Sequence, residues 1–311
     1  MKKTFFRLLG IVLFGIILHK IDLSKAISIL LSDIRLGYLL AAMFFILLQV
    51  SLKAYRWNYL KKRQKMRFSL KDSFLMYLSS LYLGIITPGR VGEFSKILYL
   101  KKNGQGMVKS SVSVVIDRLG DLIFLVLVGI GGMFFFSGIF NKELRLISYF
   151  LVILLIVFIV FIINKKISKK ILRKIFMILI PNKHHEKVNS FPKEFYLETK
   201  KIKTRDFVMT ALITIITFIL YYIMTFLLAL SLNIKIPFFY LSICVTVSMF
   251  ITMIPISIAG IGTRDLTLIG LFSFLNISNE AAVAFSTLIL LMNVFIAFVG
   301  LICWFKKPLT T

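Results

Sequence analysis

Four long runs without a charged side chain constrain this chain more than any other feature of its sequence. They cover residues 122–140, 146–163, 207–232 and 281–305. The hydrocarbon core of a bilayer, about 30 Å thick, takes about 20 apolar residues of helix to cross, and these runs meet or approach that length. They are continuously apolar rather than alternating, which argues against transmembrane β-strands, and a helix satisfies its own backbone hydrogen bonds in lipid. The sequence therefore predicts an all-α, polytopic integral membrane protein.

We predict six full transmembrane helices and two interrupted membrane segments, which together make eight. The full spans are expected at about residues 5–19, 37–55, 110–137, 146–163, 207–232 and 281–304. The interrupted segments, 72–100 and 237–275, contain Pro and Gly and are interpreted as re-entrant hairpins or broken helices. The basic, apolar N-terminus lacks a small-x-small cleavage site and is interpreted as an uncleaved first span. Residues 1–311 are expected to form a single transmembrane domain.

The basic charge of the chain supports an orientation in the membrane. The formal net charge is +26, but Lys and Arg gather between the apolar runs, as the positive-inside rule predicts. No DNA- or RNA-binding motif accompanies them, so nucleic acid is not an expected partner. With the N-terminus in the cytoplasm, the predicted cytoplasmic segments hold about five times as many Lys and Arg as the outer ones. We predict a multi-pass protein of the cell membrane, plasma or inner, with both termini inside.

One basic cytoplasmic loop, residues 164–205, stands out within this layout. Its segment 165–181 interleaves Lys and Arg with Ile and Phe, a pattern typical of an amphipathic helix lying on a membrane surface. Anionic lipid headgroups are its expected partner. The rest of this loop is polar and too short for a catalytic domain.

Neither cysteine nor histidine indicates a metal site or a cofactor. Cys244 and Cys303 both lie in apolar runs, where packing is the expected role. His184 and His185 are adjacent in the basic loop and lack Cys or acidic partners at ligand spacing. We predict no metal, no cofactor and no catalytic residue.

The two interrupted segments repeat one pattern in opposite orientations. One reads SSLYLGIITPGRVGEFSKILYL and the other SMFITMIPISIAGIGTRDLTLIGLF. Each has an apolar leg, a Pro, close glycines, an Arg, an acid and a second apolar leg. The first is predicted to enter from the cytoplasm and the second from outside, and inverted repeats with discontinuous helices are typical of transporters. Two unrelated Gly/Pro kinks are the alternative.

Seven charged residues fall at membrane depth. A charge near the bilayer centre costs at least about 2.5–3.5 kcal/mol, so we expect these side chains to face one another or a wet cavity. On a helix Asp117 and Asp121 share a face, and Arg118 can pair with Asp121 three residues on. A purely structural ion-pair network is the alternative to a functional one. The seven are Arg90, Glu93, Asp117, Arg118, Asp121, Arg264 and Asp265.

The glycine-rich turns indicate anion binding. TPGRVG and AGIGTR are each expected to form a tight turn that opens a helix, where free N–H groups bind anions. An adjacent arginine adds a bidentate donor that suits phosphate. Without lipid, Glu93, Asp117 and Asp121 are expected to hold Arg118 and the two turn arginines. The predicted headgroup-binding residues are Arg90, Gly92, Glu93, Gly260, Gly262, Arg264 and Asp265.

Three motifs together resemble a known membrane family. TPGRVGE (87–93), DRLGD (117–121) and PISIAGIGTRD (255–265) are similar to the motifs of the lysylphosphatidylglycerol synthase transmembrane-region family, also called flippase-like domain proteins. The first motif follows the family's P-x-R-x-G-E. The third departs from it, because Ala259 stands for a Gly and Asp265 for a Glu. The resemblance covers about residues 5–305.

The resemblance implies a role in moving lipids. Large members of the family join this region to a soluble domain that transfers lysine to phosphatidylglycerol, and the membrane region is thought to move the product across the bilayer. The leading hypothesis is a lipid translocase whose partner is a phospholipid or glycolipid headgroup. The alternatives are a phosphatidylglycerol lysyltransferase or its membrane subunit, for which a soluble domain is expected and not found in the sequence, and a non-transporting scaffold for envelope synthesis. A homo-oligomer also stays open.

Overall fold

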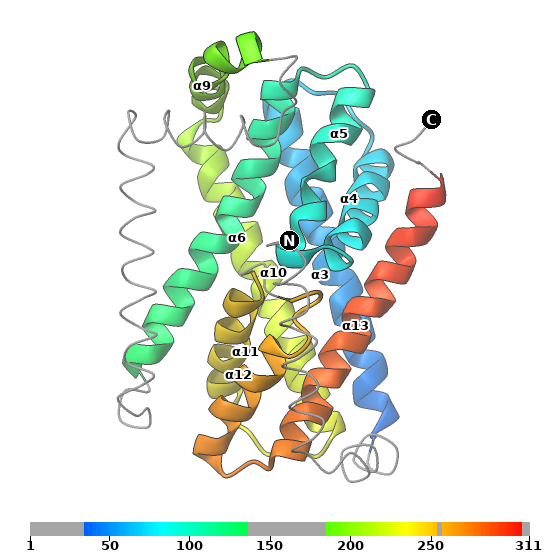
Figure 1. Cartoon of the computed structure of the whole chain (residues 1–311), viewed down its shortest axis with the longest axis vertical. Helices are drawn as coiled ribbons and strands as arrows, with labels where there is room; N and C mark the ends of the chain where they lie inside the picture. Colours follow the sequence, from blue (N-terminus) through cyan, green and yellow to red (C-terminus); the bar gives the residue numbers. More distant parts are fainter. Residues whose placement is uncertain (1–33, 136–184, 254–256, 307–311) are drawn as a thin grey trace.

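The computed structural model describes residues 34–135, 185–253 and 257–306, and in these ranges the chain is helical without a strand (Figure 1). Within the described residues, three helices are long and apolar enough to cross a membrane: α3 (Leu36–Arg63), α10 (Thr204–Ser231) and α13 (Asn279–Lys306). Each has 28 residues and so a length of about 42 Å. The prediction of an all-α membrane protein is confirmed. The predicted spans 5–19 and 146–163 and the basic segment 165–181 lie outside the described residues.

Helix α3 differs from the predicted span 37–55, because it continues to Arg63. The sequence interpretation ended the span where Lys53 and Arg56 begin a basic stretch. In the structure Gln49, Lys53 and Arg56, spaced as one helical face, turn toward the interior of the bundle, and Gln49 and Arg56 are buried. The charge count places residues 53–71 in a cytoplasmic segment between spans, and that assignment is wrong for Lys53 and Arg56, which lie on a helix inside the bundle.

The remaining long helix, α6 (Met107–Phe135), runs through the predicted span 110–137 as one continuous element. Helix α10 packs along α3, and α13 packs along α4 (Leu70–Ile85). Helix α9 (His185–Lys200) lies within the predicted basic loop 164–205, for which the sequence interpretation gave helix only at 165–181.

The first interrupted segment is a helical hairpin made of α4, the 3₁₀ segment η1 (Pro88–Phe94) and α5 (Ser95–Lys102). Gly89 and Arg90 turn the chain with φ of 61° and 56°, in the left-handed region that non-glycine residues rarely adopt. Gly92 then lies against α4, where a β-carbon would collide with the carbonyl of Leu83. Glycine at this position lets the two legs approach closely, as small residues do between membrane helices.

The second interrupted segment is also a hairpin, made of α11 (Phe238–Thr252), a connecting loop, α12 (Thr263–Phe272) and η3 (Ser273–Leu275). Ala259, Gly260 and Gly262 all have positive φ, so the turn is tight, as predicted. Asp265 caps α12, because its Oδ2 accepts a 2.8 Å hydrogen bond from the backbone N–H of Gly262.

The two hairpins enter the bundle from opposite ends, and their tips meet near its mid-height (Figure 1). Asn293 of α13 lies beside both tips, at the midpoint of that helix. The inverted relation predicted from the two sequences is therefore the arrangement in space.

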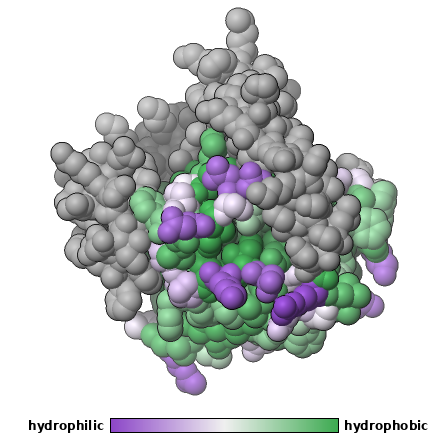
Figure 2. Space-filling view, turned by 90° about the horizontal axis from the view of Figure 1, so that it is seen from below, coloured by the Kyte–Doolittle hydropathy of each residue, from purple (hydrophilic) through white to green (hydrophobic). Residues whose placement is uncertain are grey.

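The outer flanks of the bundle are apolar. Leu36, Leu40 and Phe44 of α3 and Leu212 and Ile216 of α10 are all exposed, each following its helix at intervals of four residues. Figure 2 shows the bundle from the lower end of Figure 1, where α12 ends. Hydrophilic residues gather around the middle of this face, and hydrophobic residues form most of the described flank. An apolar girdle around a polar interior is the arrangement that a lipid environment favours.

Candidate functional site

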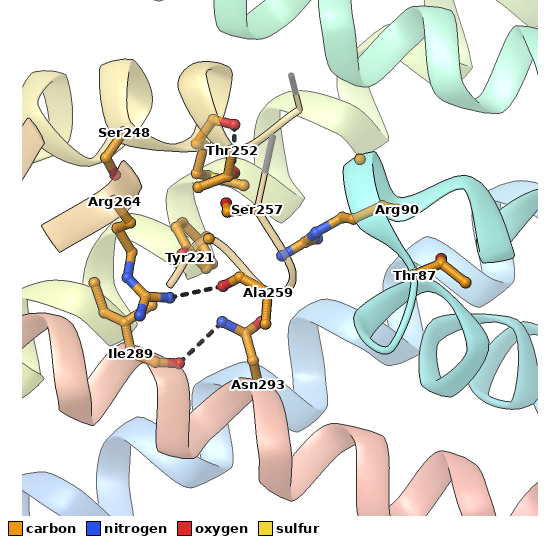
Figure 3. Close-up of a pocket in the computed structure, with 13 residues that line it drawn as sticks. Thr87, Arg90, Tyr221, Ser248, Thr252, Ser257, Ala259, Arg264, Ile289 and Asn293 are labelled. Carbon is orange, nitrogen blue, oxygen red and sulfur yellow. Dashed lines mark hydrogen bonds between the residues drawn. The ribbon is translucent and has the colours of Figure 1, made fainter. Parts of the chain in front are cut away.

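A small pocket, here called the tip pocket, lies where the two hairpin tips meet (Figure 3). The first tip contributes Arg90 and the second contributes Arg264. The free volume is about 20 Å³, which is room for about one water molecule, so the pocket is closed to a headgroup in this conformation. Its lining consists of Thr87, Gly89, Arg90, Tyr221, Ser248, Met249, Thr252, Ser257, Ala259, Gly260, Arg264, Ile289 and Asn293.

Arg90 reaches from η1 across the pocket toward the loop that holds Ala259 (Figure 3). Within the described part of the chain its one ion pair is with Glu93, at 3.9 Å between Nη1 and Oε1, and no hydrogen bond to its guanidinium is formed there. Its side chain keeps 34% of its exposure. A guanidinium with five donors and one long ion pair has capacity for an anionic ligand.

Arg264, in contrast, is built into its surroundings. It is buried, and its Nε donates a 2.7 Å hydrogen bond to the hydroxyl of Ser286 on α13. The same hydroxyl donates to Asp265, whose Oδ1 lies 3.7 Å from Arg264 Nη2. A 3.4 Å bond from Nη1 to the carbonyl of Ala259 ties the arginine to the tip. Arg264 therefore offers a fixed positive charge at the pocket wall, held by α12 and α13 together.

Neutral polar groups complete the pocket. Tyr221 of α10 is 8% exposed, and its hydroxyl has no hydrogen-bond partner among the residues that the structure covers. Ser248 and Thr252 donate their hydroxyl protons to helix carbonyls at 2.9 and 2.7 Å, so lone pairs remain for a donor from a ligand. Asn293 donates to the carbonyl of Ile289 at 2.9 Å, and its amide oxygen is an additional acceptor.

A second polar centre, here called the Arg56 cluster, lies nearer the end of the bundle where α3 stops. Arg56 is 1% exposed. Its Nε donates to Asp117 at 3.0 Å, and its Nη1 donates to Asp121 at 2.7 Å and to Thr214 at 2.6 Å. Three helices, α3, α6 and α10, thus meet on one guanidinium. The cluster comprises Lys53, Arg56, Glu93, Lys96, Asp117, Arg118 and Asp121.

Within the Arg56 cluster, cations outnumber carboxylates by four to three. Lys96 is buried and lies 2.9 Å from Asp117, with its ammonium 4.4 Å from the ring centroid of Tyr77, a cation–π distance. Arg118 pairs with Glu93 at 2.5 Å. Glu93 therefore links the cluster to Arg90, and the two centres form one continuous path of charge.

The structure corrects the predicted pairing of the membrane-depth charges. Asp117 and Asp121 hold Arg56 rather than the turn arginines, and Arg264 is held by Ser286 and its neighbour Asp265. Arg118 does pair with Glu93 and reaches Asp121 at 4.0 Å, three residues along the helix, as expected.

Two of the backbone N–H groups expected to bind an anion donate to side chains of the protein instead. The backbone N–H of Gly92 donates to the hydroxyl of Thr87 at 2.7 Å, and that of Gly262 donates to Asp265. These two glycines shape the turns, while Gly260 lines the pocket itself. The side chains at the tips, and not these amides, are the groups that face the pocket.

Sequence reasoning missed several members of the two centres. The sequence prediction counts Arg56 and Lys96 with the cytoplasmic segments 53–71 and 96–109 rather than with the charges at membrane depth. Positions 49, 53 and 56 follow the continuously apolar residues 36–48 directly and are spaced as one helical face, which is a sequence signal that the helix continues with a polar side. Tyr221 and Asn293 show no comparable signal, because a single polar residue in an apolar helix does not by itself indicate a binding site.

Comparison with known proteins agrees with this architecture. The family described as lysylphosphatidylglycerol synthase TM region matches residues 5–300. A UPF0104 membrane protein of Methanocaldococcus jannaschii is 27% identical over 303 residues, covering 92% of this chain and 89% of the relative. A UPF0104 membrane protein of Pyrococcus horikoshii is 26% identical over 314 residues, with 93% and 92% covered. No solved structure matches the chain. The protein therefore belongs to the lysylphosphatidylglycerol synthase TM-region family.

Proposed function

We propose that this membrane protein is a lipid translocase, in which a lipid phosphate passes between the two hairpin tips. The observation that carries the proposal is the opposed pair of guanidinium groups, Arg90 and Arg264, on hairpins that enter from opposite ends. A guanidinium binds phosphate through two parallel hydrogen bonds. A site near mid-height between inverted elements is where alternating access places a substrate.

The resting pocket holds about one water molecule, so transport requires the tips to separate. Each tip carries residues with left-handed backbone, Gly89 and Arg90 in one and Ala259 and Gly260 in the other. These turns join the two helices of each hairpin, so in our proposal each hairpin moves as one unit. Movement of one hairpin would open the pocket toward one leaflet while the other hairpin closes the opposite side.

The test is a flipping assay on purified protein in liposomes. Vesicles carry trace amounts of acyl-chain-labelled phospholipid, and dithionite quenches label in the outer leaflet only. We expect the protected fraction to fall below half in vesicles containing the protein and to stay near half in empty vesicles and in vesicles with heat-denatured protein. Equal protection in all three would reject translocation. Appearance of lysylphosphatidylglycerol in a synthase-free host expressing this chain would favour the lysyltransferase alternative.

We further propose that the chain has eight membrane segments with both termini in the cytoplasm, as the distribution of Lys and Arg predicts. Asn103, after α5, and Asn233, after α10, are exposed turns at opposite ends of the bundle. In a background with Cys244 and Cys303 replaced by Ala, we expect Asn233→Cys to react with an impermeant maleimide on intact cells. Asn103→Cys should react only after the membrane is opened. The reverse pattern contradicts the proposed orientation.

A further inference from the structure

The described lining of the tip pocket has an excess of positive charge. Two guanidinium groups line the pocket, and its lining within the described ranges includes no carboxylate. The two nearest acids lie behind these arginines and are shared with other groups. Glu93 is 3.9 Å from Arg90 but 2.5 Å from Arg118. Asp265 is 3.7 Å from Arg264 and also accepts from Gly262 and Ser286. The adjoining Arg56 cluster is itself one positive charge in excess. The electrostatic potential at the pocket therefore favours anions and disfavours cations.

The remaining polar groups of the pocket suit the hydroxyl groups of a ligand. Ser248, Thr252 and Asn293 present neutral acceptors, as described above, and Tyr221 presents a buried hydroxyl without a partner in the described chain. Alcohol groups both donate and accept, so they match such a mixed wall. An ammonium group could donate to the same acceptors, but it would bring a positive charge beside two guanidinium groups, with no carboxylate among the described lining residues to neutralise it.

We infer that the translocated lipid has an anionic phosphate and a neutral, hydroxyl-bearing headgroup, and that lipids with an ammonium or lysyl headgroup are excluded. The inference rests on the proposed function and narrows it to one chemical class of substrate. It also separates this chain from the lysine-modified lipid in the name of its family. Recognition combines Arg90 and Arg264 on the phosphate with Tyr221 and Asn293 on the alcohol groups.

The experiment compares four labelled lipids in the same liposome assay: phosphatidylglycerol, phosphatidylinositol, phosphatidylethanolamine and lysylphosphatidylglycerol. We expect the first two to flip at least about tenfold faster than the last two, because like charges placed together in an interface cost several kcal/mol. Equal rates for all four lipids would overturn the inference and leave translocation standing. No flipping of any lipid would instead reject the proposed function.

Asn293→Asp is the matched variant, because it places a carboxylate beside both arginines with almost no change in size. We expect the preference for phosphatidylglycerol over phosphatidylethanolamine to fall about tenfold. Asn103→Asp, which adds the same charge at the exposed end of α5, should keep the wild-type preference.

Tyr221→Phe is a second, uncharged probe of the pocket wall. It should slow the flipping of phosphatidylglycerol with little effect on folding. Wild-type selectivity in both Asn293→Asp and Tyr221→Phe, each monodisperse in detergent, would overturn the inference.

Discussion

Arg56→Gln should destabilise the protein more than any other single substitution of a charged residue in the bundle. The guanidinium is almost fully buried and binds Asp117, Asp121 and Thr214 at once. Its removal leaves the carboxylates of Asp117 and Asp121 close together inside the bundle, with one positive charge fewer to neutralise them. Removing one partner of a buried ion pair costs about 3–5 kcal/mol, which is a large share of the stability of an ordinary protein.

The measurement is the thermal midpoint and the monodisperse yield of purified protein in detergent. Arg63→Gln is the matched control, because Arg63 also pairs with an acid, Asp206 at 2.9 Å, but keeps 48% of its side-chain exposure. An exposed pair contributes about 0–1 kcal/mol, so this variant should behave as wild type. A wild-type midpoint for Arg56→Gln would show that the Arg56 cluster does not hold α3, α6 and α10 together.

Arg90→Lys should abolish most transport while leaving the protein folded. Lysine keeps the positive charge but lacks the planar fork that binds phosphate through two bonds. Among the described residues Arg90 has one ion pair, a long one to Glu93, so little of the described structure depends on its guanidinium. We expect flipping per folded protein to fall at least about tenfold, with an unchanged thermal midpoint.

Arg264→Lys provides the contrast on the opposite hairpin. Its guanidinium bonds Ser286 and the carbonyl of Ala259, so this variant should lose stability as well as transport. Arg63→Lys, at the end of α3, is the control that should change neither. Full transport by both Arg90→Lys and Arg264→Lys would reject bidentate phosphate binding and leave the two arginines as structural partners of the tips.

The sequence predicted the elements whose determinants are local. Apolar length identified the spans that the structure describes, and the repeated Pro, Gly and Arg pattern identified both hairpins and their opposed directions. Each left-handed turn at Gly89, Gly260 and Gly262 follows from residues that tolerate that backbone. These features need no knowledge of what lies across the bundle.

The partners of the buried charges could not be predicted in the same way. Asp117 and Arg56 are 61 residues apart, and only the packing of α3 against α6 brings them together. A hydropathy interpretation counts Arg56 with a cytoplasmic segment. The spacing of residues 49, 53 and 56 indicates that they share one helical face, but it does not identify the acids on other helices that this face meets. Tyr221 and Asn293 entered the site for the same reason, through the meeting of α10, α13 and the two tips.

The central claim is that a lipid phosphate enters the tip pocket, and photo-crosslinking from position 221 tests it most directly. A Tyr221→p-azidophenylalanine variant is illuminated in liposomes, and lipid adducts are identified by mass spectrometry. Ile219, two residues away on α10 and 46% exposed on its lipid-facing flank, carries the same group in the control variant. We predict adducts with phosphatidylglycerol at position 221 that disappear when Arg90→Lys is added, and adducts at position 219 that follow only the lipid composition of the vesicle. Adducts at 221 that are absent, or that persist unchanged with Arg90→Lys, would contradict passage of the phosphate between the hairpin tips.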